Sequence, residues 1–280
     1  MTTAAKALPF VDGFSYGEGP RWRDGRLWFT DGPGGKVFSA GESGDLTVEV
    51  ELPHASGLGW LPDGTLVVSC LFAPFIHHVD PRGTVIATFD ISELAASAND
   101  LVVGPDGRGY VNLYGAIASQ TAGAIGLIQP DGILRVVANE LALPNGMGFL
   151  SEGSTLIVSE TNGSRILAFP TEADGGLGAP TVFADLGADR HPDGLCVDVD
   201  DGVWVGCFDS GEFLRVIEGG TVTHHVAVDS GWAVAPALGG SDRRTLYLVI
   251  DETTAEGMVT GGSVGRVMQA RVDVPGAGSP

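Results

Sequence analysis

Long apolar runs and positive charge are both scarce in this sequence. No stretch approaches the roughly 20 apolar residues that a membrane-spanning helix needs, and the start of the chain has no continuous apolar segment like that of a signal peptide. Lys and Arg total 15 against 35 Asp and Glu, a formal net charge of −20 at pH 7. Such an acidic surface repels nucleic-acid phosphates and anionic lipid. We therefore expect a small-molecule substrate, no nucleic acid or membrane partner, and a monomer or simple homodimer.

Cysteine is also rare. Cys70, Cys196 and Cys207 lie within apolar, strand-like runs, and neither a CxxC spacing nor a neighbouring histidine accompanies them. An odd number of such residues favours buried free thiols in a reducing cytoplasm over a disulfide framework or a zinc site.

Long helical patterns are missing as well. Glycine (43 residues) and proline (16) are abundant, and short β-rich runs such as "RLWFTD", "TLVVSC", "TLIVSE" and "TLYLVI" follow turns such as "WRDG", "LPDG" and "LSEG". Turn residues between β-branched runs indicate hairpins. The one predicted helix covers residues 90–100, with Ser92 as a possible cap, so we expect an all-β protein.

The turns recur with a longer period. Small-residue segments precede the β-rich runs, and successive segments start 38–48 residues apart. A repeat of about 40–50 residues that contains several strands is typical of a β-propeller blade. Six repeats predict a single six-bladed β-propeller domain over residues 1–280, in which each segment opens the innermost strand. The N-terminal "LPFVDG" is predicted to pair with "GRVMQARVDV" and complete the last blade, and the tail "PGAGSP" to fray. The segments begin at Glu18, Ser56, Asn99, Asn145, Asp193 and Ala233.

Innermost strands line the central channel of a propeller, so the first residues of the repeats should meet at one mouth of that channel. Glu18, Asn99, Asn145 and Asp193 supply two carboxylates and two amides there. Each alone is an ordinary turn residue, but together in a channel they would repel or stay unsatisfied without a positive partner. We predict that these four bind one divalent metal ion. Calcium is favoured, because it prefers such oxygen ligands, with Zn2+, Mg2+ or Mn2+ as alternatives.

The second strand of each blade runs antiparallel to the first and should return to the same mouth. Phe72, Phe75 and Tyr114 would give the entrance an aromatic wall, and "LFAPFIHHVD" is either a lid or a continuously paired part of blade two. His77 with His78, and His224 with His225, are placed on third strands, and His191 is the best placed histidine. The predicted substrate-binding residues are Phe72, Phe75, Asn112, Tyr114, Glu160 and Asp209.

The motifs "GEGPRW", "ANDLVVGPDGRGYV", "LPNGMGF", "PDGLCVDVDDGVWV" and "ALGGSDRRTLYLV" resemble those of the SMP-30/gluconolactonase/LRE-like family of six-bladed propellers. The resemblance runs from about residue 14 to residue 271. It implies that a divalent metal, often calcium, binds Glu18, Asn99, Asn145 and Asp193. These are the same four residues that the repeat pattern indicates. It also implies hydrolysis of a lactone or a related ester. Related propellers hydrolyse organophosphates, and others are not hydrolytic.

One position departs from the family pattern. Sugar-lactonase members carry an arginine two residues before the "ND" asparagine, and here that residue is Ser97. The run "YVNLYGAIASQ" also lacks the acidic residue that such members place on the next strand. We therefore expect a lactone less polar than a sugar lactone.

Lactone hydrolysis needs an electrophile for the developing oxyanion and a base for water. We predict that Asp193 is both a metal ligand and the base or nucleophile, with Glu18 the less favoured base. No GxSxG motif is present, and "DGPGGK" is not a complete phosphate-binding loop. The alternatives are organophosphate or epoxide hydrolysis, a cyclase or isomerase step, or a calcium-binding propeller without enzymatic activity.

Overall fold

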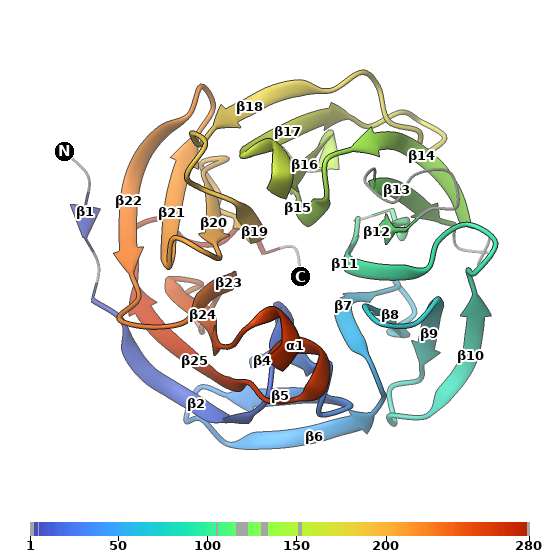
Figure 1. Ribbon diagram of the computed structural model, residues 1–280, viewed down its shortest axis with the longest axis horizontal. Helices are drawn as coiled ribbons and strands as arrows, with labels where there is room; N and C mark the ends of the chain where they lie inside the picture. Colours follow the sequence, from blue (N-terminus) through green and yellow to red (C-terminus); the bar gives the residue numbers. More distant parts are fainter. Residues whose placement is uncertain are drawn as a thin grey trace.

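A ring of six antiparallel sheets forms the molecule, as shown in Figure 1 by a computed structural model. The structure describes residues 3–4, 6–104, 106–115, 123–129, 134–150 and 153–278. Consecutive strands of the sequence lie side by side within each sheet, and the first strand of each repeat is nearest the centre. The predicted all-β, six-bladed propeller is confirmed.

The first three blades follow the chain in order. Blade one contains β3 (Gly17–Arg23), β4 (Arg26–Asp31), β5 (Lys36–Gly41) and β6 (Leu46–Glu51). Blade two contains β7 (Ala55–Trp60), β8 (Leu66–Cys70), β9 (Phe75–Val79) and β10 (Val85–Asp90). Blade three contains β11 (Ser97–Val103), β12 (Gly109–Tyr114), β13 (Gly123–Ile128) and β14 (Leu134–Leu141).

The last three blades include the two additions made by the N-terminal segment. Blade four contains β15 (Pro144–Leu150), β16 (Thr155–Glu160), β17 (Arg165–Pro170) and β18 (Thr181–Asp185), with a 3-10 turn, η2 (Thr161–Gly163), after β16. Blade five contains β19 (Pro192–Val197), β20 (Val203–Cys207), β21 (Glu212–Ile217), β22 (Thr221–Ala227) and the added β1 (Thr3–Ala4). Blade six contains β23 (Trp232–Gly239), β24 (Thr245–Glu252), β25 (Val264–Arg271) and the N-terminal β2 (Leu8–Phe14).

The ring closes by pairing the two ends of the chain. β2 pairs antiparallel with β25, from Leu8 opposite Gln269 to Phe14 opposite Gly265. This is the predicted closure. β1 then continues along the outer edge of blade five, parallel to β22, so the N-terminal segment joins blades five and six.

Residues 90–100 do not form the predicted helix. A single turn at Ile91, with Leu94 N and Ala95 N both donating to Ile91 O, leads directly into β11. Ile91 and Ala95 are buried in the core between blades two and three, and the chain must become extended to bring Asn99 onto an innermost strand. The α-helix in the described part of the chain is instead α1 (Ala255–Thr260). Thr254 caps its N-terminus, because the Thr254 side chain accepts a hydrogen bond from Gly257 N at 3.1 Å.

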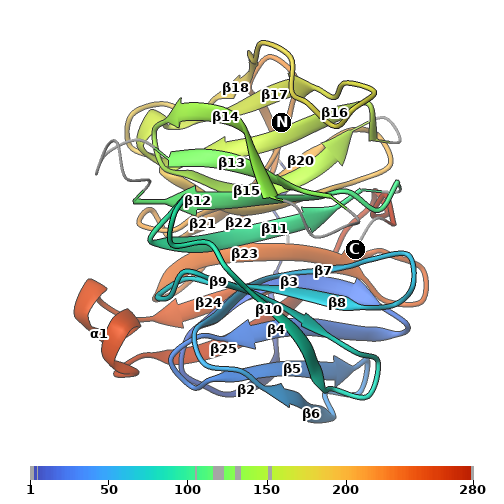
Figure 2. The same ribbon diagram turned by 90° about the vertical axis from the view of Figure 1, so that its right-hand side faces the viewer.

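The C-terminal tail is ordered by hydrogen bonds as far as residue 278, so the expectation that "PGAGSP" frays is wrong for that part; residues 279–280 lie outside the described residues. Val199 N donates to Pro275 O, Gly276 N to Arg243 O, and Ala277 N to Val197 O. The tail and α1 lie on opposite faces of the disc (Figure 2). No helix in the described part of the chain is long and apolar enough to cross a membrane.

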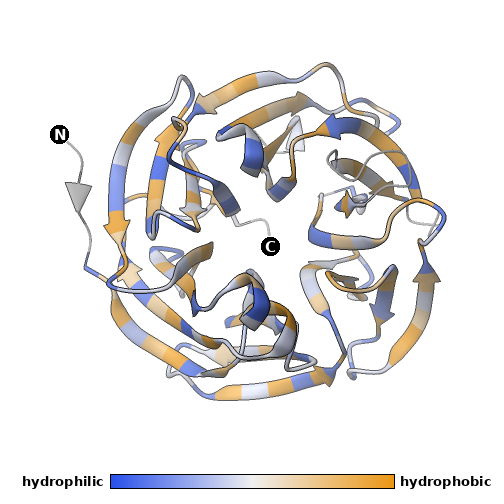
Figure 3. Cartoon of the chain, in the orientation of Figure 1, coloured by the Kyte–Doolittle hydropathy of each residue, from blue (hydrophilic) through white to orange (hydrophobic). Residues whose placement is uncertain are grey.

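The apolar core lies between neighbouring blades, because each sheet buries both faces. One cluster joins Leu150 and Ile166 of blade four to Leu195 and Val205 of blade five, and another joins Phe29 of blade one to Tyr247 of blade six. Hydrophilic segments of the innermost strands stand around the centre of the ring (Figure 3). Packing thus fixes the blades and leaves polar side chains for the channel.

Candidate metal and active site

The innermost strands share an irregularity at the repeat positions predicted from the sequence. In all six blades the pairing of the first and second strands shifts register there. A β-bulge bends the strand and redirects the side chains at the bulge. We call the end of the channel where the innermost strands begin the upper mouth, and the opposite end the lower mouth. The shifts fall between Glu18 and Arg21, Ala55 and Leu58, Ala98 and Leu101, Pro144 and Met147, Pro192 and Leu195, and Ala233 and Ala235.

The four predicted metal ligands come together at the upper mouth, and all are buried. Asn99 Nδ2 donates to Asn145 Oδ1 at 3.2 Å, and the Asn145 amide hydrogen-bonds the Asp193 carboxylate. The charge of Asp193 in turn acts on Glu18. Ser56, at the same phase in blade two, donates from Oγ to Asn99 Oδ1 at 2.6 Å. Blades one to five therefore each contribute one polar residue to the cluster.

The two carboxylates of this cluster are electrostatically unfavourable in their present surroundings. Burial, followed by the charge of Asp193, raises the pKa of Glu18 well above its usual value. Burial, followed by the charge of Asp100, raises the pKa of Asp193 to about 8, although the Asn145 hydrogen bond opposes this shift. Neither Glu18 nor Asp193 forms an ion pair with any described Lys, Arg or His. Two buried acidic groups without a cationic side chain invite a bound cation.

The chemistry of the donors selects the kind of cation. Two carboxylates and two amides are oxygen ligands of the type that calcium prefers, whereas zinc favours nitrogen and sulfur. Within the described residues, no three His, Cys, Asp or Glu side chains gather as a metal site, and half of the present set is amide. The residues thus fit a hard divalent cation.

Side chains of the second strands hold the bulged backbone in place. In blades one to three, a polar side chain of the second strand donates to a backbone carbonyl of the next blade's innermost strand, at the residue whose side chain joins the polar cluster. Thr30 Oγ1 donates to Ser56 O at 2.8 Å, Ser69 Oγ to Asn99 O, and Asn112 Nδ2 to Asn145 O at 2.6 Å.

Two of the residues predicted to bind substrate are buried and form hydrogen bonds within the protein. Asn112 is wholly buried and donates to the Asn145 backbone, while its Oδ1 has no partner among the described residues. Glu160 is buried too, and its carboxylate accepts from Ala142 N at 2.9 Å and from Arg165 Nε. Both side chains thus support the backbone near the predicted ligand positions, and their contact with a substrate stays a prediction.

Tyr114, Phe72 and Phe75 are only partly buried. The Tyr114 hydroxyl donates to Pro144 O at 2.7 Å and accepts from Asn99 Nδ2 at 3.0 Å, so its ring is fixed beside a predicted ligand. Phe72 packs edge-on to His54 just after β8. Phe75 opens β9, which pairs on both sides as part of blade two, whereas residues 71–74 of "LFAPFIHHVD" form the turn before it. Residues 116–122, after Tyr114, lie outside the described residues.

Asp209 lies at the upper mouth in contact with His191. His191 Nδ1 and Asp209 Oδ2 are 2.6 Å apart, and both side chains are about one third exposed (34% and 39%). The neighbouring Phe208 packs edge-on to Trp232 at 5.2 Å between ring centres. His77 and His78 lie on the third strand of their blade, as predicted. His224 and His225 lie on a fourth strand, β22, because blade five places one more strand before them than the sequence interpretation allowed.

The family model for the SMP-30/gluconolactonase/LRE-like region matches residues 16–251. The chain belongs to the SMP-30/gluconolactonase/LRE-like family. Among curated relatives, a pentonolactonase of Haloferax volcanii is 26% identical over 94% of this chain and 92% of its own length.

Solved structures of SMP-30/gluconolactonase/LRE-like proteins share the fold. A calcium-binding protein, regucalcin, from Agrobacterium tumefaciens superposes with a TM-score of 0.83 at 21% identity, covering 100% of this chain and 98% of the other. A gluconolactonase from Xanthomonas campestris gives 0.75 at 23% identity, covering 97% and 90%.

Sequence reasoning missed Tyr16 in this SMP-30/gluconolactonase/LRE-like site. Tyr16 is buried beside Glu18, and burial, followed by the charges of Glu18 and Asp193, raises the pKa of its hydroxyl well above the usual value. Tyr16 therefore stays protonated and acts as a donor toward Glu18. The signal was available, because residues two apart in an extended segment point to the same side.

Proposed function

We propose that the protein is a divalent-cation-dependent lactonase whose cation binds Glu18, Asn99, Asn145 and Asp193. The observation that carries this proposal is the convergence of two unpaired, buried carboxylates and two amides at one channel mouth. Lactonase names among the relatives support the reaction class. Calcium is the cation that these ligands favour most.

When bound, the cation would polarise the lactone carbonyl. Asp193 takes a proton from water as the water oxygen attacks the carbonyl carbon, and the ring C–O bond breaks to give a hydroxy acid. Asp193 then returns that proton to the alkoxide leaving group, and at neutral pH the carboxylic acid of the product releases one proton to solvent. The Tyr16 hydroxyl orients Glu18, and the Tyr114 hydroxyl holds Asn99, so both tyrosines keep the donor set in place.

We further propose that the substrate is less polar than a sugar lactone. Ser97, opposite Tyr114 at the start of β11, has a short side chain with no charge to offer to sugar hydroxyls. Partly exposed rings of Phe72, Phe208 and Trp232 belong to segments that reach the same mouth. Such rings suit an alkyl or aryl substituent better than a polyol.

Metal analysis of the purified protein, followed by a pH-indicator assay over alkyl, aryl and sugar lactones, tests the proposal. We expect about one divalent ion per chain, turnover that chelation abolishes and calcium restores, and loss of both metal and turnover in Asp193→Asn. Asp45→Asn, which alters an exposed carboxylate paired with Arg26 on the outer part of blade one, is the matched control and should behave as wild type.

Two results would contradict the proposal in different ways. A protein that binds calcium but opens no lactone would favour organophosphate or epoxide hydrolysis, a cyclase or isomerase step, or calcium binding alone. A protein that binds no divalent ion would overturn the metal site itself.

A further inference from the structure

Two charged residues inside the innermost strands are not used by the proposed reaction. Arg21 follows Glu18 by three residues, and Asp100 directly follows Asn99. Arg21 Nη2 donates to Asp100 Oδ1 at 2.9 Å and to Leu101 O at 2.6 Å, while Nη1 donates to Pro20 O at 2.9 Å. Both residues are buried (7% and 5% exposed). The pair thus ties blade one to blade three across the start of blade two.

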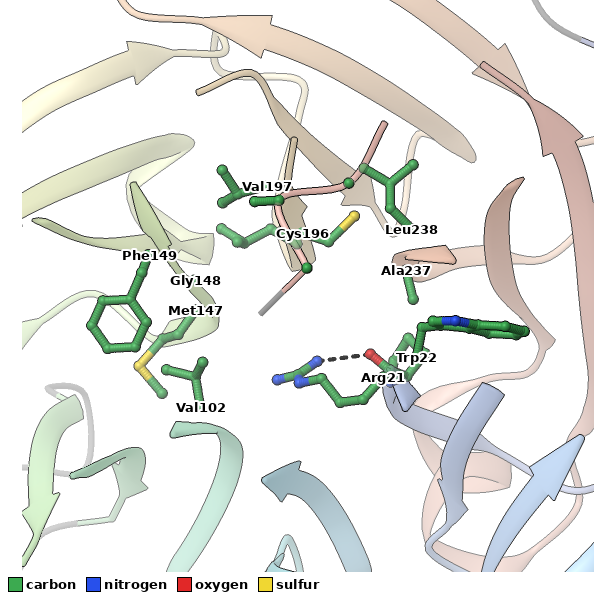
Figure 4. Close-up of a pocket in the computed structure, with 15 residues that line it drawn as sticks. Arg21, Trp22, Val102, Met147, Gly148, Phe149, Cys196, Val197, Ala237 and Leu238 are labelled. Carbon is green, nitrogen blue, oxygen red and sulfur yellow. Dashed lines mark hydrogen bonds between the residues drawn. The ribbon is translucent and has the colours of Figure 1, made fainter. Parts of the chain in front are cut away.

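The Arg21 guanidinium occupies the channel below the predicted ligands. Figure 4 shows it extending from β3 into the middle of a cavity at the lower mouth, between Met147 and Trp22. Gly276 of the C-terminal tail lines the same cavity. The cavity has a volume of about 50 Å³, which is enough for a few water molecules. The other walls are mainly apolar, so the charges of this pair are weakly screened.

Asp100 is a further buried carboxylate beside the two predicted ligand carboxylates, and its charge is compensated by Arg21. Glu18 and Asp193 together match one divalent cation, which leaves Asp100 as a third carboxylate, and its charge acts on both of them. Asp31 and Asp251 accept hydrogen bonds from Tyr16 N and Gly17 N in the segment before Glu18, and the charge of Asp251 acts on Glu18 as well. Arg21 is the described cationic side chain that pairs with Asp100.

We infer that the Arg21–Asp100 pair is a positioning element that sets the charge beneath the cation site. Asp100 holds the guanidinium away from the cation, and Arg21 cancels the charge of Asp100, so that the pair adds no net charge beneath the cation. This inference rests on the proposed metal site. It assigns a role to the arginine of "GEGPRW" and to the aspartate of "ND".

The opposite signs of the two charges make the test sharp. In Asp100→Asn an uncompensated guanidinium lies below the site, and the calcium dissociation constant should rise about 10- to 100-fold, the usual range when a residue supporting a metal ligand is lost. In Arg21→Met the bare Asp100 should lower that constant while the calcium-free protein melts at a lower temperature. The double variant R21M/D100N should bind calcium nearly as wild type does. Isothermal titration with CaCl2 and melting with and without CaCl2 give both readouts.

A second buried pair provides the control. Arg215 Nε and Asp198 Oδ2 lie 2.6 Å apart and are as buried as the first pair, but Asp198 directly follows β19 and is five residues from Asp193, about 16 Å for an extended chain. Arg215→Met and Asp198→Asn should lower the melting temperature and leave calcium affinity unchanged.

Distinct results separate the inference from the proposed site. Calcium affinity that moves in the same direction in both single variants, or in neither, overturns the inference while the site stands. A wild-type protein that binds no calcium overturns both. If Arg21→Met fails to fold, two single variants decide the matter: Arg21→Lys keeps the charge and should leave the affinity near that of wild type, whereas Asp100→Asn should weaken it.

Discussion

At the scale of single residues, Tyr16 shows how the site depends on atoms that need not touch the cation. Replacing Tyr16 by Phe removes the hydroxyl that donates to Glu18, while the ring stays in the core with Phe14 and Phe29. Loss of such a supporting donor usually weakens metal binding about 10-fold or more. We expect that reduction in calcium titrations, with an unchanged circular dichroism spectrum.

Tyr110→Phe is the matched change for Tyr16. Tyr110 is equally buried and loses a hydrogen bond to Gly175 O, far from the upper mouth. Calcium affinity should not change in that variant. An equal loss of affinity in both variants would mean that the Tyr16 effect is only a general loosening of the fold.

Ser97 gives a second prediction at this scale, on substrate preference. Ser97→Arg places a guanidinium beside Tyr114, where it can donate to sugar hydroxyls. A hydrogen bond to a charged group contributes about 1.5–3 kcal/mol, so the ratio of kcat/KM for a sugar lactone over an alkyl lactone should rise about tenfold or more. Ser97→Lys, which lacks the planar fork, should raise it less. A ratio that falls would contradict the assignment of this position.

The convergence of the four proposed ligand residues could be predicted from the sequence, but most of their hydrogen-bond partners could not. The same position within the repeat is occupied by Glu18, Asn99, Asn145 and Asp193, and a position within a repeat can be read from the sequence alone. The places of Asn112 and Glu160 depend on which neighbour their side chains reach across a blade boundary, and that depends on the twist between sheets. The Arg21–Asp100 pair joins residues 79 positions apart, a pairing that no local pattern contains.

At the scale of elements, hairpins were predictable because their turns carry local chemistry. Residues 90–100 show the limit of local reasoning: the composition favours a helix, but the blade needs Asn99 on an extended innermost strand. Helix α1 shows the converse, since a short segment between two strands forms a helix once Thr254 caps it. Tertiary position decided both segments.

The C-terminal tail gives a prediction for an element. Ending the chain after residue 274 removes the hydrogen bonds from Val199 N to Pro275 O, from Gly276 N and from Ala277 N. Each contributes about 0.5–1.5 kcal/mol, and about 1 kcal/mol lowers the melting temperature of a chain this large by roughly 2–4 °C. We expect melting to fall by about 5 °C in scanning calorimetry.

Calcium affinity should be unaffected by this truncation, because the tail lies at the lower mouth and the predicted ligands at the upper one. Ending the chain after residue 278 keeps every tail hydrogen bond described and serves as the control. Unchanged melting in the shorter protein would show that the tail does not secure the lower mouth.

At the scale of the whole molecule, the repeat explains why the four proposed ligand residues meet at one place: Glu18 lies two repeats before Asn99, and Asn145 and Asp193 follow at intervals of 46 and 48 residues. Sixfold stacking turns equal spacing along the chain into convergence around an axis, and the pairing of β2 with β25 closes the ring. The number of blades was therefore readable from the period. The attachment of β1 to blade five was not, because a two-residue parallel strand leaves no pattern in the sequence.

The same convergence concentrates negative charge, and this predicts how stability varies with pH and metal. The folded-state pKa of Glu18 is raised, and that of Asp193 is raised to about 8. An acid whose pKa is raised on folding contributes full stability below its unfolded value, near pH 4, and loses it as the pH rises through the folded value. The calcium-free protein should therefore become less stable between about pH 4 and pH 8.

Calcium should offset that loss of stability, so the increase in melting temperature on adding CaCl2 should be several degrees larger at about pH 8 than at about pH 5. In Glu18→Gln/Asp193→Asn both the pH slope and the calcium effect should shrink, and an equal calcium effect at the two pH values in the wild-type protein would contradict the assignment of these carboxylates.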